Sequence, residues 1–170
     1  MTTGWGVILG DPQNNVPPAD PLMIESITPR AGMNPVTGDP IAPANQPLKN
    51  PINGNEYSIP GNDDLQYTCI FPLATPKDCS APGVIACDCA NPNNDSPLCA
   101  PNPNNGGQRT LQARAKAYPG QRHINVIKEL GSQGVVASIC PSQTADATKA
   151  DFAYLPAARA LIDRMRSRLQ

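Results

Sequence analysis

The sequence has few of the side chains that build a large hydrophobic core. Its 170 residues include two Phe and one Trp, and Leu, Ile, Val and Phe together make up just under a fifth of the chain. Such a composition borders on that of disordered chains, but these also carry a high net charge. The formal net charge here is -1. We therefore expect a small core and a large irregular region that is held by something other than hydrophobic burial.

An excess of charge of one sign is missing as well. Lys and Arg number 13 against 14 Asp and Glu, so the chain lacks the basic surface with interleaved aromatic side chains that nucleic acid binding requires. One basic cluster occurs near the C-terminus, at Arg159, Arg164, Arg166 and Arg168. A helix favours basic residues in its last turns, so we interpret the cluster as a solvated helix face. We expect no nucleic acid partner.

Long hydrophobic runs are absent. The longest cover residues 5–9 and 134–140, far short of the roughly 20 residues that a transmembrane helix needs. Residues 1–4 show neither the basic start nor the apolar stretch of a signal peptide. We expect no transmembrane segment, and we expect an N-terminal segment outside residues 1–170 to carry an export signal.

Motifs for catalysis and nucleotide binding are also missing. There is no Gly-x-Ser-x-Gly sequence, no Gly-x-Gly-x-x-Gly sequence and no Walker-type loop, and the one histidine, His123, has no partner motif. Asp63, Asp64 and Asp78 lie in turn-rich sequence, where an aspartate bonds to the local backbone or to water far more often than it catalyses. We expect no catalytic residue, no cofactor and no metal, and hence no enzyme.

Proline and asparagine, in contrast, are abundant in the middle of the chain. Of the 21 Pro residues, 19 lie between residues 11 and 119, among repeated turn-forming sequences. Helical periodicity is absent there, although short extended pieces fit residues 21–27 and 65–71. We interpret residues 11–118 as a long, loop-rich insertion that needs cross-links to stay ordered.

Regular elements are expected on both sides of this insertion. Residues 4–10 and 134–140 are short continuous apolar runs, as in strands that are buried on both faces. Residues 119–130 predict a helix that ends at Gly131, and residues 155–169 predict a second helix with Pro156 in its first turn. The order is strand, insertion, helix, strand, helix.

This order predicts an α/β fold with part of a doubly wound parallel sheet. A strand–helix–strand unit with buried strands is the repeating unit of such sheets. Two strands leave many backbone groups unpaired, so the rest of the sheet is expected from outside residues 1–170, either from the parent domain or from an oligomer. The whole chain is then one C-terminal part of a larger domain.

The six cysteines predict a disulfide framework. An even number of cysteines in a Pro- and Asn-rich region with little core is typical of exported, cross-linked proteins, and fifteen pairings are possible. The alternative is a zinc site, but Cys87 and Cys89 are too close for a standard ligand pair and no second close pair occurs. The expected bridging residues are Cys69, Cys79, Cys87, Cys89, Cys99 and Cys140.

The predicted topology narrows the pairing. Cys140 ends the second predicted strand, on the side where the insertion leaves and re-enters the sheet, so it should pin the insertion to the sheet. Cys99 is the nearest candidate in sequence and is our expected partner for Cys140. Cys87 and Cys89 should bond to different partners, because one intervening residue gives poor geometry for a direct bridge.

Four segments carry a resemblance to a known family. They are residues 115–122, 127–131, 134–140 and 151–157, and with the apolar run at 4–10 they resemble the C-terminal portion of von Willebrand factor A-like domains in exported bacterial proteins. The resemblance implies a doubly wound fold and a role in binding proteins. The family often binds through a metal-ion-dependent adhesion site, whose signature, Asp-x-Ser-x-Ser, is absent from this chain, so no metal ligand is carried over.

Two functions from different classes follow. The first is a non-enzymatic extracellular or surface module, located outside the cell, at the cell surface or in the periplasm, that binds a protein or surface ligand. The second is a fragment of an exported hydrolase whose catalytic residues lie outside this chain.

Overall fold

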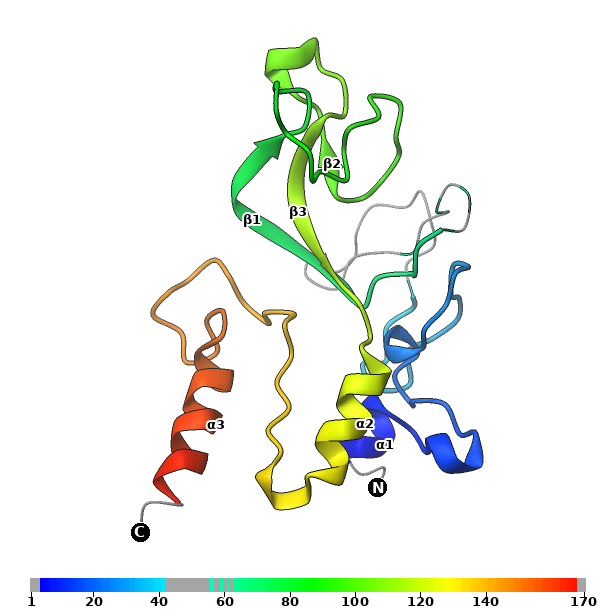
Figure 1. Cartoon of the computed structure of the whole chain (residues 1–170), viewed down its shortest axis with the longest axis vertical. Helices are drawn as coiled ribbons and strands as arrows, with labels where there is room; N and C mark the ends of the chain where they lie inside the picture. The colour runs from blue at the N-terminus through cyan, green and yellow to red at the C-terminus, as the bar shows by residue number, and fades with distance from the viewer. Residues whose placement is uncertain (1–3, 42–55, 57–58, 60, 62, 168–170) are drawn as a thin grey trace.

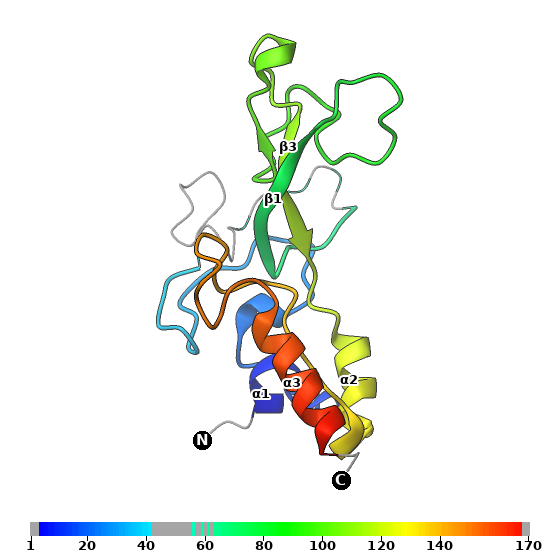
Figure 2. The ribbon, with the colours of Figure 1, turned by 90° about the vertical axis from the view of Figure 1, so that its left-hand side faces the viewer.

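The computed structural model describes residues 4–41, 56, 59, 61 and 63–167, and they form a mixed α/β structure (Figure 1). A small sheet lies at one end of the long axis and the helices lie at the other (Figures 1 and 2). We call residues 63–117, which hold the sheet, the stapled base, and residues 121–167, which hold two of the helices, the arm.

The sheet has three antiparallel strands in the order β1-β3-β2. They are β1 (Cys69–Asp78), β3 (Leu111–Ala117) in the centre and the short β2 (Cys99–Ala100). Cys69 pairs with Ala117 at the end nearest the arm, and the pairing with β3 shifts between Pro72 and Lys77. Prolines are tolerated in β1 because it is an edge strand. A proline has no N–H to donate to the neighbouring strand, and at the irregular stretch between Pro72 and Lys77 the pairing with β3 is interrupted.

The predicted parallel, doubly wound sheet is wrong for the described residues. All three strands lie within residues 11–118, which we expected to be an insertion without a sheet of its own. Residues 4–10 are not a strand: they hold the helix α1 (Gly4–Ile8), followed by the buried Leu9. A run this short has no clear period, so apolar character alone cannot separate a helix from a buried strand. The carbonyls of Gly6 and Val7 accept hydrogen bonds from the backbone of residues 19 and 20, which complete the end of the helix.

The second predicted strand, residues 134–140, is also absent as a strand. The chain is extended at Gly134 (ψ 141°), but no residue from 135 to 139 makes a backbone–backbone hydrogen bond within the described part of the chain. An extended segment becomes a strand only when a neighbour pairs with it, and none of the described strands reaches this one. Figure 1 shows the segment running between the two helices of the arm.

Both helices of the arm were predicted. The helix α2 (Gln121–Glu129) follows Gly120, and Gly131 takes a left-handed φ of 54° just past its end. The helix α3 (Leu155–Arg166) has Pro156 in its first turn, where a missing N–H removes no helical bond. Short 3-10 helices complete the structure: η1 (Pro12–Asn14), η2 (Pro21–Met23), η4 (Pro103–Asn105) and η5 (Gly131–Gln133).

The core lies almost entirely around the stapled base. Its buried residues are Ile59, Tyr67, Ile70, Cys79, Cys89, Leu98 and Cys99. Beyond Ala117, the buried residues of the described chain are two prolines, Pro119 and Pro141, and Pro141 is the one buried residue among 121–167. The base therefore has a small core, and the arm has none of its own.

Candidate interaction surface

All six cysteines form disulfides, which confirms the predicted framework. The bonds are Cys69–Cys140, Cys79–Cys87 and Cys89–Cys99. Every thiolate that a zinc site would use is consumed, so the zinc alternative is excluded for the cysteines. Cys87 and Cys89 bond to different partners, as expected.

The predicted pairing of Cys140 with Cys99 is wrong. Cys99 begins β2 and bonds to Cys89 inside the base, whereas Cys140 bonds to Cys69 at the start of β1. Cys69 pairs with Ala117, the last residue of β3, just before the chain turns into the arm. Cys140 therefore bonds to the cysteine that lies close to the arm in space, and not to the one that is nearest in sequence. This disulfide is the covalent link between the base and the arm.

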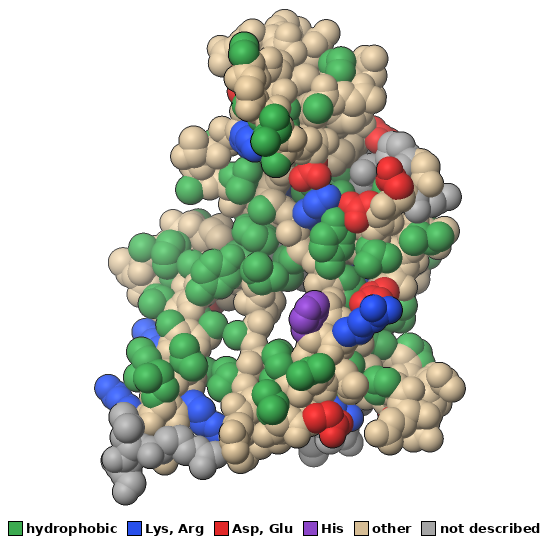
Figure 3. Space-filling view, in the orientation of Figure 1, with side chains coloured by type: hydrophobic (Ala, Val, Ile, Leu, Met, Phe, Trp, Pro, Cys, Tyr) green, Lys and Arg blue, Asp and Glu red, His purple; other side chains and the backbone are tan. Residues whose placement is uncertain are grey.

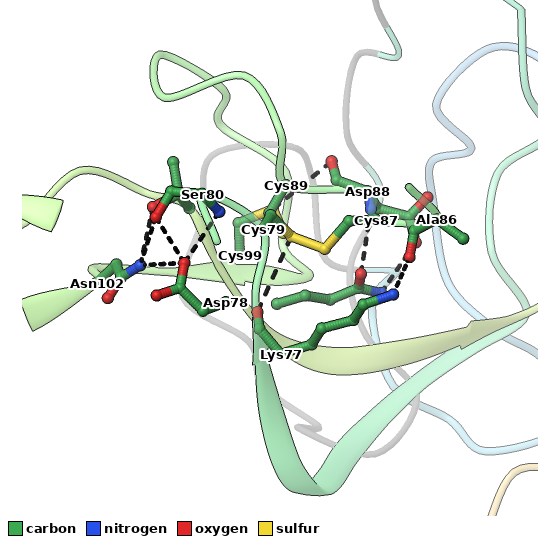
Figure 4. Close-up of a disulfide and its surroundings, with 12 residues drawn as sticks. Lys77, Asp78, Cys79, Ser80, Ala86, Cys87, Asp88, Cys89, Cys99 and Asn102 are labelled. Atoms are coloured by element: carbon green, nitrogen blue, oxygen red, sulfur yellow. Dashed lines mark hydrogen bonds between the residues drawn. A yellow bond between two sulfur atoms is a disulfide. The ribbon is translucent and has the colours of Figure 1, made fainter. Parts of the chain in front are cut away.

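Polar contacts around the two smaller disulfides hold the loops of the base (Figure 4). Asp78 accepts hydrogen bonds from the backbone and hydroxyl of Ser80 and, at 2.7 Å, from the buried Asn102. Lys77 donates to the carbonyl of Ala86, beside the Cys79–Cys87 bond. Asp78 thus has the local bonding role expected from the sequence. These contacts give the base few free polar groups and a fixed shape.

The polar side chains of β3 bond to two loops of the base, at Asp88 and Pro97. The three polar side chains of this strand alternate with apolar ones, and each reaches out of the sheet to a loop. Gln112 exchanges hydrogen bonds with the backbone and carboxylate of Asp88, and Arg114 donates to the carbonyl of Pro97. Lys116 also bonds to Asp88, at 2.9 Å. One strand face therefore organises the loop that carries Cys87 and Cys89.

Lys116 lies at the centre of an ion-pair junction near the end of β3, where the chain leaves the base. Its Nζ is 3.0 Å from Asp64 Oδ2, and it lies 5.4 and 5.5 Å from the ring centres of Tyr67 and Tyr118. The Tyr118 hydroxyl donates to the same Asp64 oxygen at 2.8 Å. The cation and both rings attract each other in this geometry. Asp64, which the sequence placed in a solvated turn, instead bonds to side chains far away in the chain.

This junction shifts the pKa values of its lysine and of one of its carboxylates, Lys116 and Asp64. Burial acts to lower the pKa of Lys116, but its contacts with Tyr118, Asp88 and Asp64 outweigh burial and raise the pKa. Burial acts to raise the pKa of Asp64, but hydrogen bonds from Tyr118 and Lys116 outweigh burial and lower the pKa. Both groups are thus held in their charged forms. A lysine that stays protonated has no lone pair for nucleophilic attack, so the geometry suits a structural ion pair.

Another ion pair, which is buried, ties the N-terminal loops to the base. The Arg30 side chain, which is 7% exposed, bonds to Glu56 at 2.7 Å and donates to the carbonyl of Tyr67. Its other end group donates to three carbonyls in one turn of chain, at Pro21, Leu22 and Ile24. The planar guanidinium can satisfy all these acceptors at once. Residues 21–30 are therefore fixed against the start of β1.

The arm, in contrast, exposes most of its apolar side chains. Among the described residues, nine of the fifteen large hydrophobic side chains that are exposed belong to the arm. They are Val126, Leu130, Val136, Ile139, Tyr154, Leu155, Leu161, Ile162 and Met165. Figure 3 shows hydrophobic side chains over α3 and the neighbouring chain. Uncovered apolar side chains in this number on one part of a molecule mark an interaction surface.

The helix α3 exposes its apolar side chains, whereas a fully packed helix would bury them. Its half-buried residues are Ala157 and Arg164, which lie two turns apart on one side. The apolar stripe of this helix lies mostly on another side and is exposed: Leu161, Ile162 and Met165 are 51%, 48% and 57% exposed. We call this stripe, with Leu155 and Ala158, the α3 stripe. About half of the surface of its large side chains is therefore uncovered within the described chain.

A cavity separates α3 from the extended segment beside it. It has a volume of about 320 Å³ and is lined mainly by small and apolar residues, among them Val136, Ala137, Ala157 and Ala160. On its other side, the segment approaches α2, because a Cβ at Gly134 would fall 2.5 Å from the carbonyl oxygen of Ile127. The arm is therefore an extended, unpaired chain between two helices.

The remaining residues that the sequence singled out are scattered. His123 lies exposed on α2, and Asp63 is exposed at the first residue of the base. The sequence analysis did not single out the α3 stripe as a functional surface, because a helical apolar stripe signals that something covers it but not what.

Comparisons of the chain with protein-family models, with curated proteins and with solved structures found no match. Among the described residues, no helix has both the length and the apolar character needed to cross a bilayer.

Proposed function

We propose that this protein is a non-enzymatic binding module that acts outside the cell, with the stapled base as a rigid support and the arm as the binding surface. The resemblance to the C-terminal part of von Willebrand factor A-like domains of exported bacterial proteins stays a prediction, because the described strands form an antiparallel sheet and not the doubly wound sheet of that family. The observation that carries the proposal is the arm, in which an apolar segment without backbone partners and the α3 stripe are largely exposed within the described chain.

The backbone of the extended segment indicates what kind of partner the arm accepts. Residues 135–139 offer backbone donors and acceptors without backbone partners, and unpaired strand edges recruit further strands. Val135 and Val136 favour such pairing, since β-branched side chains suit a pleated surface. The partner is therefore a polypeptide that presents an extended, mainly apolar strand, and a further layer over it would cover the α3 stripe.

The disulfides support an oxidising location. Three bonds in 170 residues are typical of exported proteins and are rare in a reducing cytosol. Secretion, the periplasm or the cell surface would each supply such conditions.

A crosslinking experiment tests this function. A photoreactive phenylalanine analogue replaces Val136 in the protein expressed with export, and crosslinked peptides are mapped by mass spectrometry. We expect one dominant crosslink to an apolar, extended segment of another polypeptide, and the map shows whether that segment comes from the same parent protein or from a separate one.

Ile85 provides the matched control. It is 98% exposed, but it lies on a loop of the base, away from the arm. Equal crosslinking at positions 85 and 136, or crosslinks at 136 scattered over many unrelated proteins, would contradict the proposal. Hydrogen exchange gives a second readout: amides 135–139 should exchange rapidly in the free chain and become protected in the crosslinked complex.

A further inference from the structure

A second concave site lies on the side of α2 that faces the N-terminal loops. It has a volume of about 440 Å³. It is lined by Leu9, Pro12, Asn15, Val16, Pro17, Gln121, Arg122 and Asn125. It shares no residue with the α3 stripe or with the extended segment. Figure 1 shows α1 and α2 side by side at this end of the molecule.

The N-terminal wall of this site has a fixed shape. Asp11 accepts hydrogen bonds from the backbone of Gln13 and Asn14, and its own backbone exchanges two hydrogen bonds with Val16, of 2.8 and 2.9 Å. Gly10 has a φ of 70° and lies so close to the loop that a Cβ would fall 2.2 Å from the Val16 carbonyl oxygen. Only glycine fits there. The wall is thus a closed turn that exists before any ligand arrives.

Gln121 fixes the two walls to each other. Its side-chain amide donates to the carbonyl of Ile8 at 2.8 Å and to that of Met23 at 2.7 Å. These contacts join the first turn of α2 to segments about a hundred residues earlier in the chain. A site with preformed walls loses less entropy when it binds a ligand.

The lining of the site combines an apolar floor with unused polar groups. Leu9, which is 2% exposed, belongs to the apolar part of the lining, and Val16 and two prolines complete that part. Arg122 is the one charged residue among the lining residues, and no hydrogen bond or ion pair occupies its side chain within the described structure. The side chains of Asn15 and Asn125 have no hydrogen-bond partner there either.

We propose that this site binds an apolar group that carries a carboxylate, as the carboxyl terminus of a peptide does. The Arg122 guanidinium would bind the carboxylate in a two-point geometry. Asn15 and Asn125 each offer a donor and an acceptor, which match the last peptide group of such a ligand. The last side chain would lie on Leu9 and Val16. A free aliphatic acid shares this chemistry without the peptide group.

Three probes separate these possibilities. Binding is measured by calorimetry and by two-dimensional amide NMR of the whole chain, with N-acetyl-Ala-Leu, its C-terminal amide and hexanoate. We expect the peptide acid to bind and to shift signals of α2 and residues 9–17, and its amide to bind at least tenfold more weakly, because it lacks the charge that Arg122 pairs with. Equal binding of acid and amide would overturn the proposal. Hexanoate binding as tight as the peptide acid would assign the site to free aliphatic acids.

Substitutions locate the binding group. Arg122→Ala should weaken binding of the peptide acid about tenfold or more and leave the weak binding of its amide unchanged. Arg122→Lys keeps the charge but not the planar two-point geometry, so it should retain part of the affinity. Arg166→Ala removes an equally exposed arginine from α3 and serves as the control. Unchanged binding in Arg122→Ala, or an equal loss in Arg166→Ala, would refute the assignment.

Discussion

At the scale of single residues, the structure is held by a few polar groups that each satisfy several partners. Arg30 joins three loop carbonyls, Glu56 and the start of β1, and Lys116 joins two carboxylates and two rings. In a chain with so few large apolar side chains, polar side chains with several partners contribute part of the stability that a hydrophobic core would otherwise provide. Substitution of one such side chain would remove the contacts of several loop segments at once.

The Asp64 junction makes stability depend on pH. Although burial alone would raise the pKa of Asp64, its hydrogen bonds from Tyr118 and Lys116 lower the pKa below that of the unfolded chain. The unfolded state therefore takes up this proton first as the pH falls. The stabilisation is fully present above about pH 5 and is lost progressively below about pH 4.

Urea unfolding from pH 7 to pH 3 measures this effect. Asp64→Asn should lower stability at pH 7 by about 1 kcal/mol or less, since the pair is partly exposed, and should make the acid-side decline less steep. The decline should remain in part, because Asp11, Asp78 and Asp146 also have lowered pKa values. An unchanged slope in the variant would show that Asp64 takes no part in it.

Two glycines separate backbone strain from steric conflict. Gly10 and Gly107 both have left-handed backbones, with φ of 70° and 79°, but a Cβ at Gly107 has nothing within 4 Å. Gly107→Ala should cost about 1 kcal/mol of unfolding free energy from φ alone. Gly10→Ala should cost clearly more, because its Cβ would overlap the backbone of Val16 and Pro17. Thermal and urea unfolding compare the two, and equal losses would contradict the closed turn described for residues 10–17.

At the scale of elements, the two helices of the arm were predictable, whereas α1 and the positions of the strands were not. Both helices of the arm are marked by local signals, at Gly120, Gly131 and Pro156, which act within a turn of the chain. The runs at residues 4–10 and 134–140 carry apolar character but no information on a partner. A strand exists only where a distant segment pairs with it, so this part of the fold depends on contacts that composition does not encode.

The strand β3 did carry a signal in the sequence. From Leu111 to Ala117, apolar and polar residues alternate strictly, with the period of a strand that is buried on one face. The signal is weak because three of the four apolar positions are alanine, a poor strand former. The overlap of β1 with the expected extended piece at residues 65–71 covers three residues, Cys69 to Phe71. The disulfides, in contrast, were predictable as a set because their number and context suffice.

The α3 stripe gives a prediction that distinguishes an open arm from a packed one. Ile162→Asp should change the unfolding free energy of the free chain by less than about 0.5 kcal/mol, because the side chain is 48% exposed. Ile70→Ala, at a fully buried position, should cost about 2–5 kcal/mol. Denaturant unfolding checks both. A large loss in Ile162→Asp would mean that the stripe is already covered in the free chain. The same substitution should reduce crosslinking from position 136.

At the scale of the whole molecule, the three disulfides connect different parts of the structure and close loops of very different length. Cys79–Cys87 and Cys89–Cys99 close short loops of sequence separation 8 and 10 inside the base. Cys69–Cys140 closes a loop of sequence separation 71 and holds the arm against the sheet. Since Pro141 is the one buried residue among the described residues of the arm, this bond matters more to the position of the arm than packing does.

Paired cysteine substitutions test this division. In the chain-entropy treatment, removing Cys69–Cys140 costs about 4 kcal/mol of unfolding free energy and removing Cys79–Cys87 about 2.5 kcal/mol. The double variant Cys69→Ala, Cys140→Ala should also accelerate hydrogen exchange in α2, while the variant lacking Cys79 and Cys87 should affect exchange in the base. The opposite order of stabilities, or unchanged exchange in α2, would contradict the role assigned to the long loop.

The Cys69–Cys140 bond also has a mechanical consequence. A pulling force applied at the two termini would pass from Cys69 directly to Cys140, so the 71-residue span between them would carry no tension. That span includes the whole sheet and α2. Reduction of the bond would release about 250 Å of additional contour length, at roughly 3.5 Å per residue. A tethered copy in a single-molecule stretching experiment would therefore be short and stiff when oxidised, and long and compliant when reduced.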